Sequence, residues 1–181
     1  MIRYLIYMVL LSVLSTSCAT SFTPFTSRLY QESNWTEEEL HSIQFWLSED
    51  IVLRRVQRGN LSEIEEGEIK VVNGERVEEV FLPKGTPGVY LFRPKANRLA
   101  ISFEAEGDDR YLVFGPSPRE NNRFVLLAKD WSRREGTVTY GGKLYRVDAR
   151  AADAALLVDL KRVNRTIIDS RTAKGRKVKD D

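Results

Sequence analysis

Acidic side chains form the densest group of chemically competent residues in this sequence. Glu104, Glu106, Asp108 and Asp109 come together at a predicted strand-to-strand turn. Oxygen-rich loops can bind Ca²⁺, and two facing carboxylates can hydrolyse a glycosidic bond. The spacing matches no calcium loop, however, and Arg110 follows directly. We therefore interpret the group as a solvated hairpin tip, with calcium binding and carboxylate-based hydrolysis of glycan or peptidoglycan as the alternatives.

Other catalytic side chains are scarce. The chain has one histidine, His41, and one cysteine, Cys18. His41 falls inside a predicted helix with no nucleophile elbow nearby, so a Ser–His–Asp triad is not expected. Zinc sites built from Cys and His lack ligands, and the glycines form neither a P-loop nor a dinucleotide fingerprint. The sequence thus predicts a protein that is not an enzyme and that holds no cofactor.

Aromatic and basic residues suggest a binding face instead. Tryptophan and tyrosine are enriched at interface hot spots, and three of them lie near a predicted hairpin. Residues 161–181 contain eight Lys or Arg and three Asp, which suits anionic lipid headgroups or an acidic partner surface. Core packing of the aromatics and a solvated tail are the alternatives. The possible binding face consists of Trp131, Tyr140, Tyr145, Lys174, Arg176 and Lys177.

The first eighteen residues, MIRYLIYMVLLSVLSTSC, have the parts of a secretory signal. Arg3 is followed by an apolar run over residues 4–14, which is too short to span a bilayer. Small polar residues then lead to Cys18. This ending resembles the lipobox of bacterial lipoproteins, although Leu14 lies four residues before the cysteine where the common pattern has three. The resemblance implies that Cys18 is acylated and becomes the new N-terminus; an ordinary cleaved signal is the alternative.

The same resemblance implies a location and a set of partners. Acylation would hold the chain on a lipid bilayer and would prevent Cys18 from forming a Cys–His pair. No acidic residue follows Cys18 directly, which by resemblance favours the outer membrane, on its periplasmic side. We expect no nucleic-acid partner for an exported protein. The expected division is a signal peptide over 1–17, a lipidated tether over 18–33, one domain over 34–172 and a basic tail over 173–181.

A single amphipathic helix is predicted at the start of the domain, over residues 35–48. Thr36 and Glu39 have the spacing of a capping box. Apolar residues then recur at helical intervals from Leu40 to Leu47. Further apolar residues upstream of this helix are expected to pack on the domain, namely Phe22, Phe25, Leu29 and Tyr30.

The chain from residue 51 onward has the pattern of short strands. Asn73-Gly74 and Gly141-Gly142 each stand between two β-type arms, and such pairs accept the positive φ angles of a hairpin turn. Four further runs, over 89–92, 99–103, 111–114 and 124–128, are almost continuously apolar, which predicts strands covered on both faces. Residues 148–163 are predicted to form a helical turn and then a strand. Core positions are predicted for Phe92, Phe103, Phe114 and Phe124.

These elements predict a mainly β fold: a small antiparallel β-sandwich or partly open β-barrel with one N-terminal amphipathic helix. The expected function is a non-catalytic cell-envelope lipoprotein that serves as an adaptor or structural subunit of a periplasmic or outer-membrane assembly. Two alternatives remain open. One is a β-barrel that carries a lipid or another apolar molecule in its interior. The other is the carboxylate-based hydrolase described above.

Overall fold

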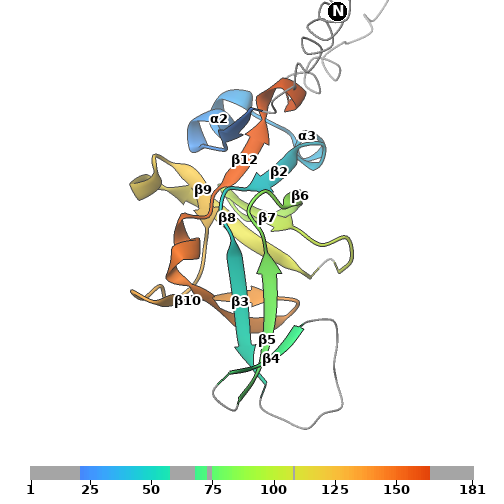
Figure 1. Ribbon diagram of the computed structural model, residues 1–181. Helices are drawn as coiled ribbons and strands as arrows, with labels where there is room; N and C mark the ends of the chain where they lie inside the picture. Colours follow the sequence, from blue (N-terminus) through green and yellow to red (C-terminus); the bar gives the residue numbers. More distant parts are fainter. Residues whose placement is uncertain (1–20, 58–67, 73–74, 108, 164–181) are drawn as a thin grey trace, which may run out of the picture.

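The chain folds into two antiparallel β-sheets with a sandwich-like arrangement (Figure 1). The structure is a computed structural model, and it describes residues 21–57, 68–72, 75–107 and 109–163. The seven-stranded sheet contains, in spatial order, β1 (Phe22–Pro24), β12 (Leu156–Asp159), β2 (Gln44–Leu47), β6 (Pro87–Lys95), β7 (Arg98–Ser102), β8 (Tyr111–Ser117) and β9 (Arg123–Leu126). The five-stranded sheet contains β10 (Glu135–Tyr140), β11 (Lys143–Asp148), β3 (Ile51–Val56), β5 (Glu75–Leu82) and β4 (Glu68–Val72).

This architecture confirms the predicted mainly β, antiparallel fold class. Isolated bridges connect Val125 in β9 to Ala155 and Arg123 to Thr26, so the seven-stranded sheet curls toward its own first strands. These contacts are single bridges, and among the described residues no continuous ladder closes the sheet into a barrel. The sandwich-like alternative therefore describes the fold better than the barrel.

A bent two-stranded ribbon connects the two sheets. Strand β2 pairs with β6 in the first sheet, and their continuations β3 and β5 pair in the second. At the corner, the Gly85 amide donates to the Leu47 carbonyl at 2.8 Å, and the Lys84 amide donates to Asp50 Oδ1 at 2.6 Å. Gly85 has a φ of +80°, which a side chain would strain. Strands that change sheets through such bends form the corners of β-sandwiches.

The buried core draws on both sheets and on the N-terminal segment. The ring of Phe25 lies at its centre, with centroid distances of 5.6 Å to Trp35, 5.3 Å to Phe45 and 4.9 Å to Phe124. Phe25 is fully buried, and Leu29 and Tyr30 pack against the same cluster, as predicted. Phe22 is 43% exposed. The segment from Phe22 onward, part of the predicted tether, thus contributes a strand and a helix to the folded body.

The predicted helix over residues 35–48 is correct only in its first half. Helix α3 (Glu37–His41) has the predicted capping box, with Thr36 Oγ1 accepting from the Glu39 amide at 3.2 Å. The chain then turns at Ser42 and becomes strand β2. An alternation of fully buried and half-buried residues accompanies this change, with Phe45 and Leu47 fully buried in a strand between β12 and β6. A second short helix, α2 (Ser27–Ser33), precedes α3.

Both predicted hairpins are present. Strands β4 and β5 pair with Val72 opposite Glu75, and β10 and β11 pair with Tyr140 opposite Lys143. In the second hairpin Gly141 and Gly142 have φ angles of +54° and +68°, as a type I′ turn requires. Residues 73–74 of the first turn lie outside the described residues. Residues 148–159 form a 3₁₀ turn, η2 (Ala149–Asp153), and then β12, as predicted, whereas residues 160–163 are helical and do not continue the strand.

The prediction of four strands covered on both faces is only partly right. Strands β7 and β9 are buried along most of their length, whereas β6 begins with an alternation of exposed and buried residues. Phe114 and Phe124 are fully buried and Phe103 is partly buried. Phe92 is 40% exposed, so its predicted core position is wrong. A register shift between Tyr90 and Phe92 turns this ring toward the surface.

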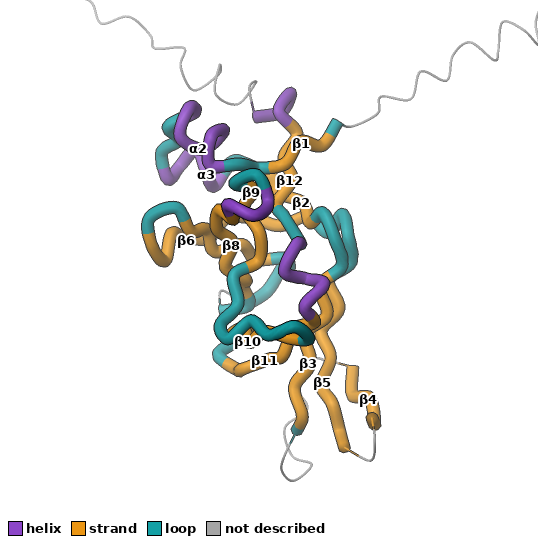
Figure 2. Tube along the Cα trace, turned by 90° about the vertical axis from the view of Figure 1, so that its left-hand side faces the viewer, coloured by secondary structure: helices purple, strands orange, loops and turns teal. Residues whose placement is uncertain are grey.

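The described chain contains no helix with the length and apolar character that crossing a membrane requires. A second 3₁₀ turn, η1 (Pro118–Glu120), links β8 to β9. Figure 2 shows the α-helices at the same end of the molecule as β1 and β12, while β3, β4 and β5 form the opposite end.

Candidate binding pocket

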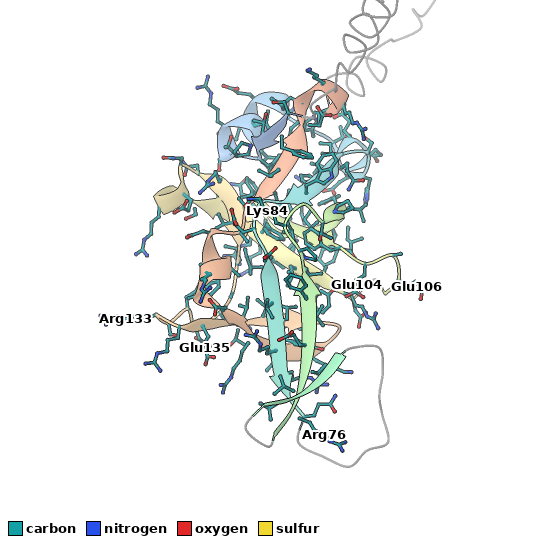
Figure 3. The ribbon with its side chains drawn as sticks, in the orientation of Figure 1. Arg76, Lys84, Glu104, Glu106, Arg133 and Glu135 are labelled. Atoms are coloured by element: carbon teal, nitrogen blue, oxygen red, sulfur yellow. The ribbon has the colours of Figure 1, made fainter. Side chains whose placement is uncertain are left out.

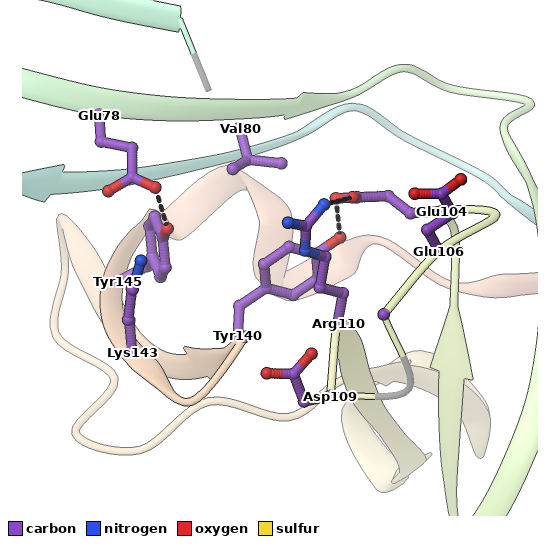
Figure 4. Close-up of a pocket in the computed structure, with 11 residues that line it drawn as sticks. Glu78, Val80, Glu104, Glu106, Asp109, Arg110, Tyr140, Lys143 and Tyr145 are labelled. Atoms are coloured by element: carbon purple, nitrogen blue, oxygen red, sulfur yellow. Dashed lines mark hydrogen bonds and ion pairs between the residues drawn. The ribbon is translucent and has the colours of Figure 1, made fainter. Parts of the chain in front are cut away.

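A polar pocket of about 300 Å³ lies between the two sheets, where the turn from β7 to β8 meets the inner face of the five-stranded sheet. Figure 4 shows two groups of charged and phenolic side chains on its two sides, with Val80 between them. One group is centred on Glu78 and the other on Glu104. In each group a tyrosine and an arginine bind the same carboxylate.

The Glu78 group joins three strands of the five-stranded sheet. Glu78 in β5 is directly opposite Arg55 in β3, and the two side chains form an ion pair. The Arg55 Nε donates to Glu78 Oε2 at 3.0 Å, and the Tyr145 hydroxyl in β11 donates to Oε1 at 2.6 Å. Gln57 donates to Oε2 at 3.4 Å. The carboxylate is buried, with the residue only 4% exposed, so its hydrogen bonds compensate for the loss of hydration.

The Glu104 group joins the β7–β8 turn to the β10–β11 hairpin. The Tyr140 hydroxyl donates to Glu104 Oε1, and Arg110 Nη1 donates to Oε2 at 2.8 Å. The hairpin tip is also attached through its backbone, because the Gly141 amide donates to the Asp109 carbonyl at 3.1 Å. The Tyr140 side chain is buried, at 3% exposure. Both oxygens of this carboxylate therefore have donors from within the protein.

The two tyrosines connect these groups. Tyr140 and Tyr145 lie on either side of the Gly141-Gly142 turn, and both point toward the inner face of their sheet. Their ring centroids are 6.2 Å apart with an interplanar angle of 88°, which is the edge-to-face arrangement that aromatic pairs prefer. The tight hairpin thus presents two phenol groups, each directed at a different carboxylate.

The electrostatics of the pocket keep the carboxylate at Glu78 charged and the phenols neutral. Burial opposes the charged form of Glu78, but hydrogen bonds from Tyr145, Arg55 and Gln57 outweigh it and lower the pKa of the carboxyl. Burial, with a further contribution from the hydrogen bond to Glu78, raises the pKa of Tyr145 to about 12. Burial and the bond to Glu104 raise the pKa of Tyr140 further. At neutral pH both phenols therefore remain hydrogen-bond donors.

Several residues proposed from the sequence meet in this pocket. Glu104, Glu106 and Asp109 come from the acidic turn, and Tyr140 and Tyr145 come from the proposed binding face. The structure thus unites two candidate groups that lie more than thirty residues apart in the sequence. Asp108, Lys174, Arg176 and Lys177 lie outside the described residues.

Trp131 does not line this pocket. Its ring covers Gly136 so closely that a Cβ added there would lie 2.5 Å from Trp131 Cε3. The residue is 36% exposed. Figure 3 shows Arg133 and Glu135, from the same stretch of chain, on the opposite side of the molecule from Glu104 and Glu106. The proposed aromatic face therefore divides into two buried tyrosines at the pocket and one tryptophan elsewhere.

The acidic turn has a different organisation from the solvated tip that we expected. Glu104 is held by Arg110 and Tyr140, whereas Glu106 and Asp109 are exposed at the rim. No three His, Cys, Asp or Glu residues of the described chain come together as a group that could hold a metal ion. The candidate calcium ligands that are described thus do not form a cation cage.

The sequence reasoning missed Glu78 and Arg55, although a signal was present. Residues 51, 53 and 55 share one face of β3, and residues 78, 80 and 82 share one face of β5. Each set has two apolar members and one charged member, and the two charges are of opposite sign. A pair of opposite charges placed on the apolar faces of adjacent strands predicts a buried ion pair.

The arrangement can do recognition chemistry more readily than bond cleavage. Its charged and phenolic groups are fixed by one another, so the pocket is preorganised. The exposed rim residues Glu106 and Asp109 give it an acidic border, which Lys143 interrupts.

Comparison with protein families, with curated proteins and with solved structures found no match for this chain.

Proposed function

We propose that the protein is a non-catalytic lipoprotein of the bacterial cell envelope, anchored through acylated Cys18, and that it serves as an adaptor in a periplasmic or outer-membrane assembly. The N-terminal segment supports the anchor, because it combines a short apolar run with a cysteine at the end of a lipobox-like sequence. The pocket supplies the contact with a protein partner, through a basic group of the partner that enters between the acidic rim residues.

The observation that carries this proposal is that both pocket carboxylates are held by hydrogen bonds from other side chains of the protein. Glu78 and Glu104 each accept hydrogen bonds from an arginine and from a tyrosine. Such bonds fix the shape of the site and hold both carboxylates in one orientation. A preformed polar pocket of this kind is suited to positioning a ligand group.

The hydrolase alternative lacks support from these contacts. Glycoside hydrolysis requires one carboxyl group that stays protonated near neutral pH, which calls for a raised pKa. The pKa of Glu78 is lowered, because hydrogen bonds to its charged form outweigh its burial. Both oxygens of Glu104 already accept hydrogen bonds from protein donors.

The alternative of an apolar cargo has equally little support. A carrier of this type needs a cavity lined by apolar side chains. Here Phe114 and Leu126 are packed into a core cluster that occupies the interior. The lining of the pocket between the sheets is mostly polar and charged.

The test is affinity capture with crosslinking from gently solubilised native membranes. Wild type, Cys18→Ala, Glu106→Lys and Glu135→Lys are compared. Glu106 and Glu135 are labelled on opposite sides of the molecule in Figure 3, so the second charge reversal is the matched control. We expect a stoichiometric protein partner with wild type and Glu135→Lys, weakened capture with Glu106→Lys, and loss of the partner with Cys18→Ala.

Two results would contradict the proposal. One is a partner captured equally by Glu106→Lys and Glu135→Lys, which would remove the pocket from the interface. The other is turnover of a cell-envelope glycan by the purified protein, abolished in Glu104→Gln, which would make the protein a hydrolase. Circular dichroism of each variant establishes that it is folded.

A further inference from the structure

The outer face of the seven-stranded sheet carries an apolar row that crosses four strands. Pro24 in β1 and Trp46 in β2 are both directly opposite Leu157 in β12, and Pro87 in β6 is opposite Trp46. Residues paired in this way point to the same side of a sheet. Pro24 and Pro87 are exposed, and Trp46 and Leu157 are half-buried. Their neighbours along the strands, such as Phe45 and Leu156, are fully buried on the inner side.

Two further apolar side chains extend this row. The ring of Phe22 packs on that of Trp46, with centroids 4.8 Å apart. Val89 lies two residues after Pro87 and therefore on the same side of β6. Phe22 is 43% exposed and Val89 is 45% exposed. The resulting surface, which we call the apolar face, consists of Phe22, Pro24, Trp46, Pro87, Val89 and Leu157.

The apolar face is unusual because its large side chains adjoin one another. Single exposed apolar residues are common on soluble proteins, but contiguous groups mark surfaces that contact a partner or a membrane. Phe81, which is 55% exposed, lies opposite Val52 on the outer side of the five-stranded sheet. It provides a control surface of similar chemistry elsewhere on the same molecule.

The position of Cys18 indicates what covers the apolar face. Only four peptide units separate Cys18 from Phe22, the first residue of β1. An extended chain spans at most about 3.5 Å per residue, so an acyl group at Cys18 holds Phe22 within roughly 14 Å of the lipid headgroups. The edge of the apolar face therefore lies beside the bilayer whenever the anchor is inserted.

The sequence that follows β12 is basic, which fits a lipid surface with anionic headgroups. Phe22 is paired with Asp159, so the end of β12 lies beside the start of β1. The sequence from residue 161 onward carries eight Lys or Arg against three Asp. Each basic residue near an anionic membrane surface adds to binding. Trp46 also belongs to the residue type that concentrates at the headgroup level of bilayers.

We propose that the apolar face, centred on Phe22 and Trp46, rests on the lipid bilayer beside the acyl anchor. This inference rests on the proposed function, since it takes the anchor at Cys18 as given. The contact gives the protein a second attachment to the membrane and a fixed orientation on it. Strands β3, β4 and β5 lie at the end of the molecule opposite β1, the strand that follows the anchor (Figure 2).

The experiment uses the intact lipidated protein, reconstituted into vesicles of phosphatidylethanolamine and phosphatidylglycerol with brominated acyl chains. Bromine quenches tryptophan fluorescence on contact. The chain has three tryptophans, of which Trp35 is 5% exposed and Trp131 lies in the loop before β10. We expect quenching in wild type and in Trp131→Phe, and its loss in Trp46→Phe. Phe22→Ser should reduce the quenching several-fold, whereas Phe81→Ser should leave it unchanged.

Quenching that persists in Trp46→Phe would overturn the inference. A second result would also overturn it: Trp46 is not quenched in the vesicles and crosslinks to a protein in native membranes. Another protein would then cover the apolar face. The mass of the purified chain shows whether Cys18 carries acyl groups, and so distinguishes a failure of this inference from a failure of the proposed function. A chain without acyl groups on Cys18 contradicts the proposed anchor, whereas an acylated chain whose Trp46 is not quenched contradicts only the orientation on the bilayer.

Discussion

Two arginine–glutamate pairs link β3 to β5 at consecutive positions, and they lie on opposite faces of the same sheet. The outer pair, Arg54 with Glu79, has an Nε–Oε2 distance of 2.7 Å and side chains that are 50% and 13% exposed. The inner pair, Arg55 with Glu78, has side chains that are 29% and 6% exposed. The residue types and the register are the same. The inner pair receives an additional hydrogen bond from the Tyr145 hydroxyl.

The difference shows how the face of a strand changes the energetic role of one and the same ion pair. Exposed pairs contribute little, because water competes for both charges and the side chains lose entropy. A buried pair contributes mainly through what happens when one partner is removed, since the other charge then stays desolvated. The inner pair should therefore be hard to change and the outer pair easy to change.

The largest effect is expected for Glu78→Gln. This change keeps the side-chain volume but leaves Arg55 without its countercharge in a largely desolvated position. We expect the free energy of unfolding to fall by about 2–3 kcal/mol, at the lower end for broken buried pairs because Arg55 is partly exposed. Glu79→Gln is the matched control, with an expected loss below about 1 kcal/mol. Urea unfolding measures both, and equal losses would refute the distinction between the two faces.

Tyr145→Phe is expected to have the next largest effect. It removes the hydroxyl that donates to Glu78 at 2.6 Å and keeps the ring that packs against Tyr140. A hydrogen bond to a charged group contributes about 1.5 kcal/mol or more, so we expect a loss of about that size. The loss should be smaller in a Glu78→Gln background, which a double-mutant cycle would reveal. Strict additivity would mean that the two groups are not coupled.

Alkaline pH tests the hydrogen bond between Tyr145 and Glu78 in the wild-type protein, without a substitution at either charged residue. The pKa of Tyr145 is raised to about 12 in the folded protein, above the value of about 10 for a free tyrosine. Its stabilising contribution is thus complete below about pH 10 and is lost as the pH rises through about 12. In wild type a late phase of tyrosinate absorbance should accompany unfolding, and this phase should lose amplitude in Tyr145→Phe. Titration of every tyrosine near pH 10 in the folded state would contradict the described environment.

The smallest effect is expected at the outer pair. Arg54→Ala should lower the free energy of unfolding by about 0.5 kcal/mol, and the difference should shrink as salt is added. Urea unfolding at low and at high ionic strength measures the loss of stability and its dependence on salt. A loss of more than about 2 kcal/mol would indicate that the outer face is covered by another surface and is not solvated.

Much of the fold was predictable because it depends on local signals. The turn at Gly141-Gly142 and the capping box of Thr36 and Glu39 are determined by residues close together in the chain. The failure over residues 42–48 has a different cause. Leu40, Ile43 and Leu47 satisfy a helical repeat, while Ile43, Phe45 and Leu47 satisfy a strand repeat. Pairing with β12, more than a hundred residues away, decides between the two repeats.

The pocket was predictable only as separate fragments. The acidic turn and the tyrosine hairpin were both recognised as candidates, but their meeting depends on how the two sheets pack. Glu78 was missed because residues 76–80 were interpreted only as one arm of a hairpin. The face that Glu78 shares with Val80 was not compared with the facing residues of β3. The position of Trp131 shows the opposite error, since closeness in sequence to Tyr140 did not place it at the same site.

Strand β12 has a consequence for how the protein assembles. It is the last described strand of the chain, and it is inserted between β1 and β2, the first two. Synthesis proceeds from the N-terminus, so the gap between β1 and β2 stays open until β12 has been made. Strand β1 pairs only with β12 among the described strands, so the first strand gains its ladder only when a strand that ends at Asp159 is in place. Loss of β12 by proteolysis would remove this ladder and leave the N-terminal segment attached through the buried Phe25 and the bridge from Thr26 to Arg123.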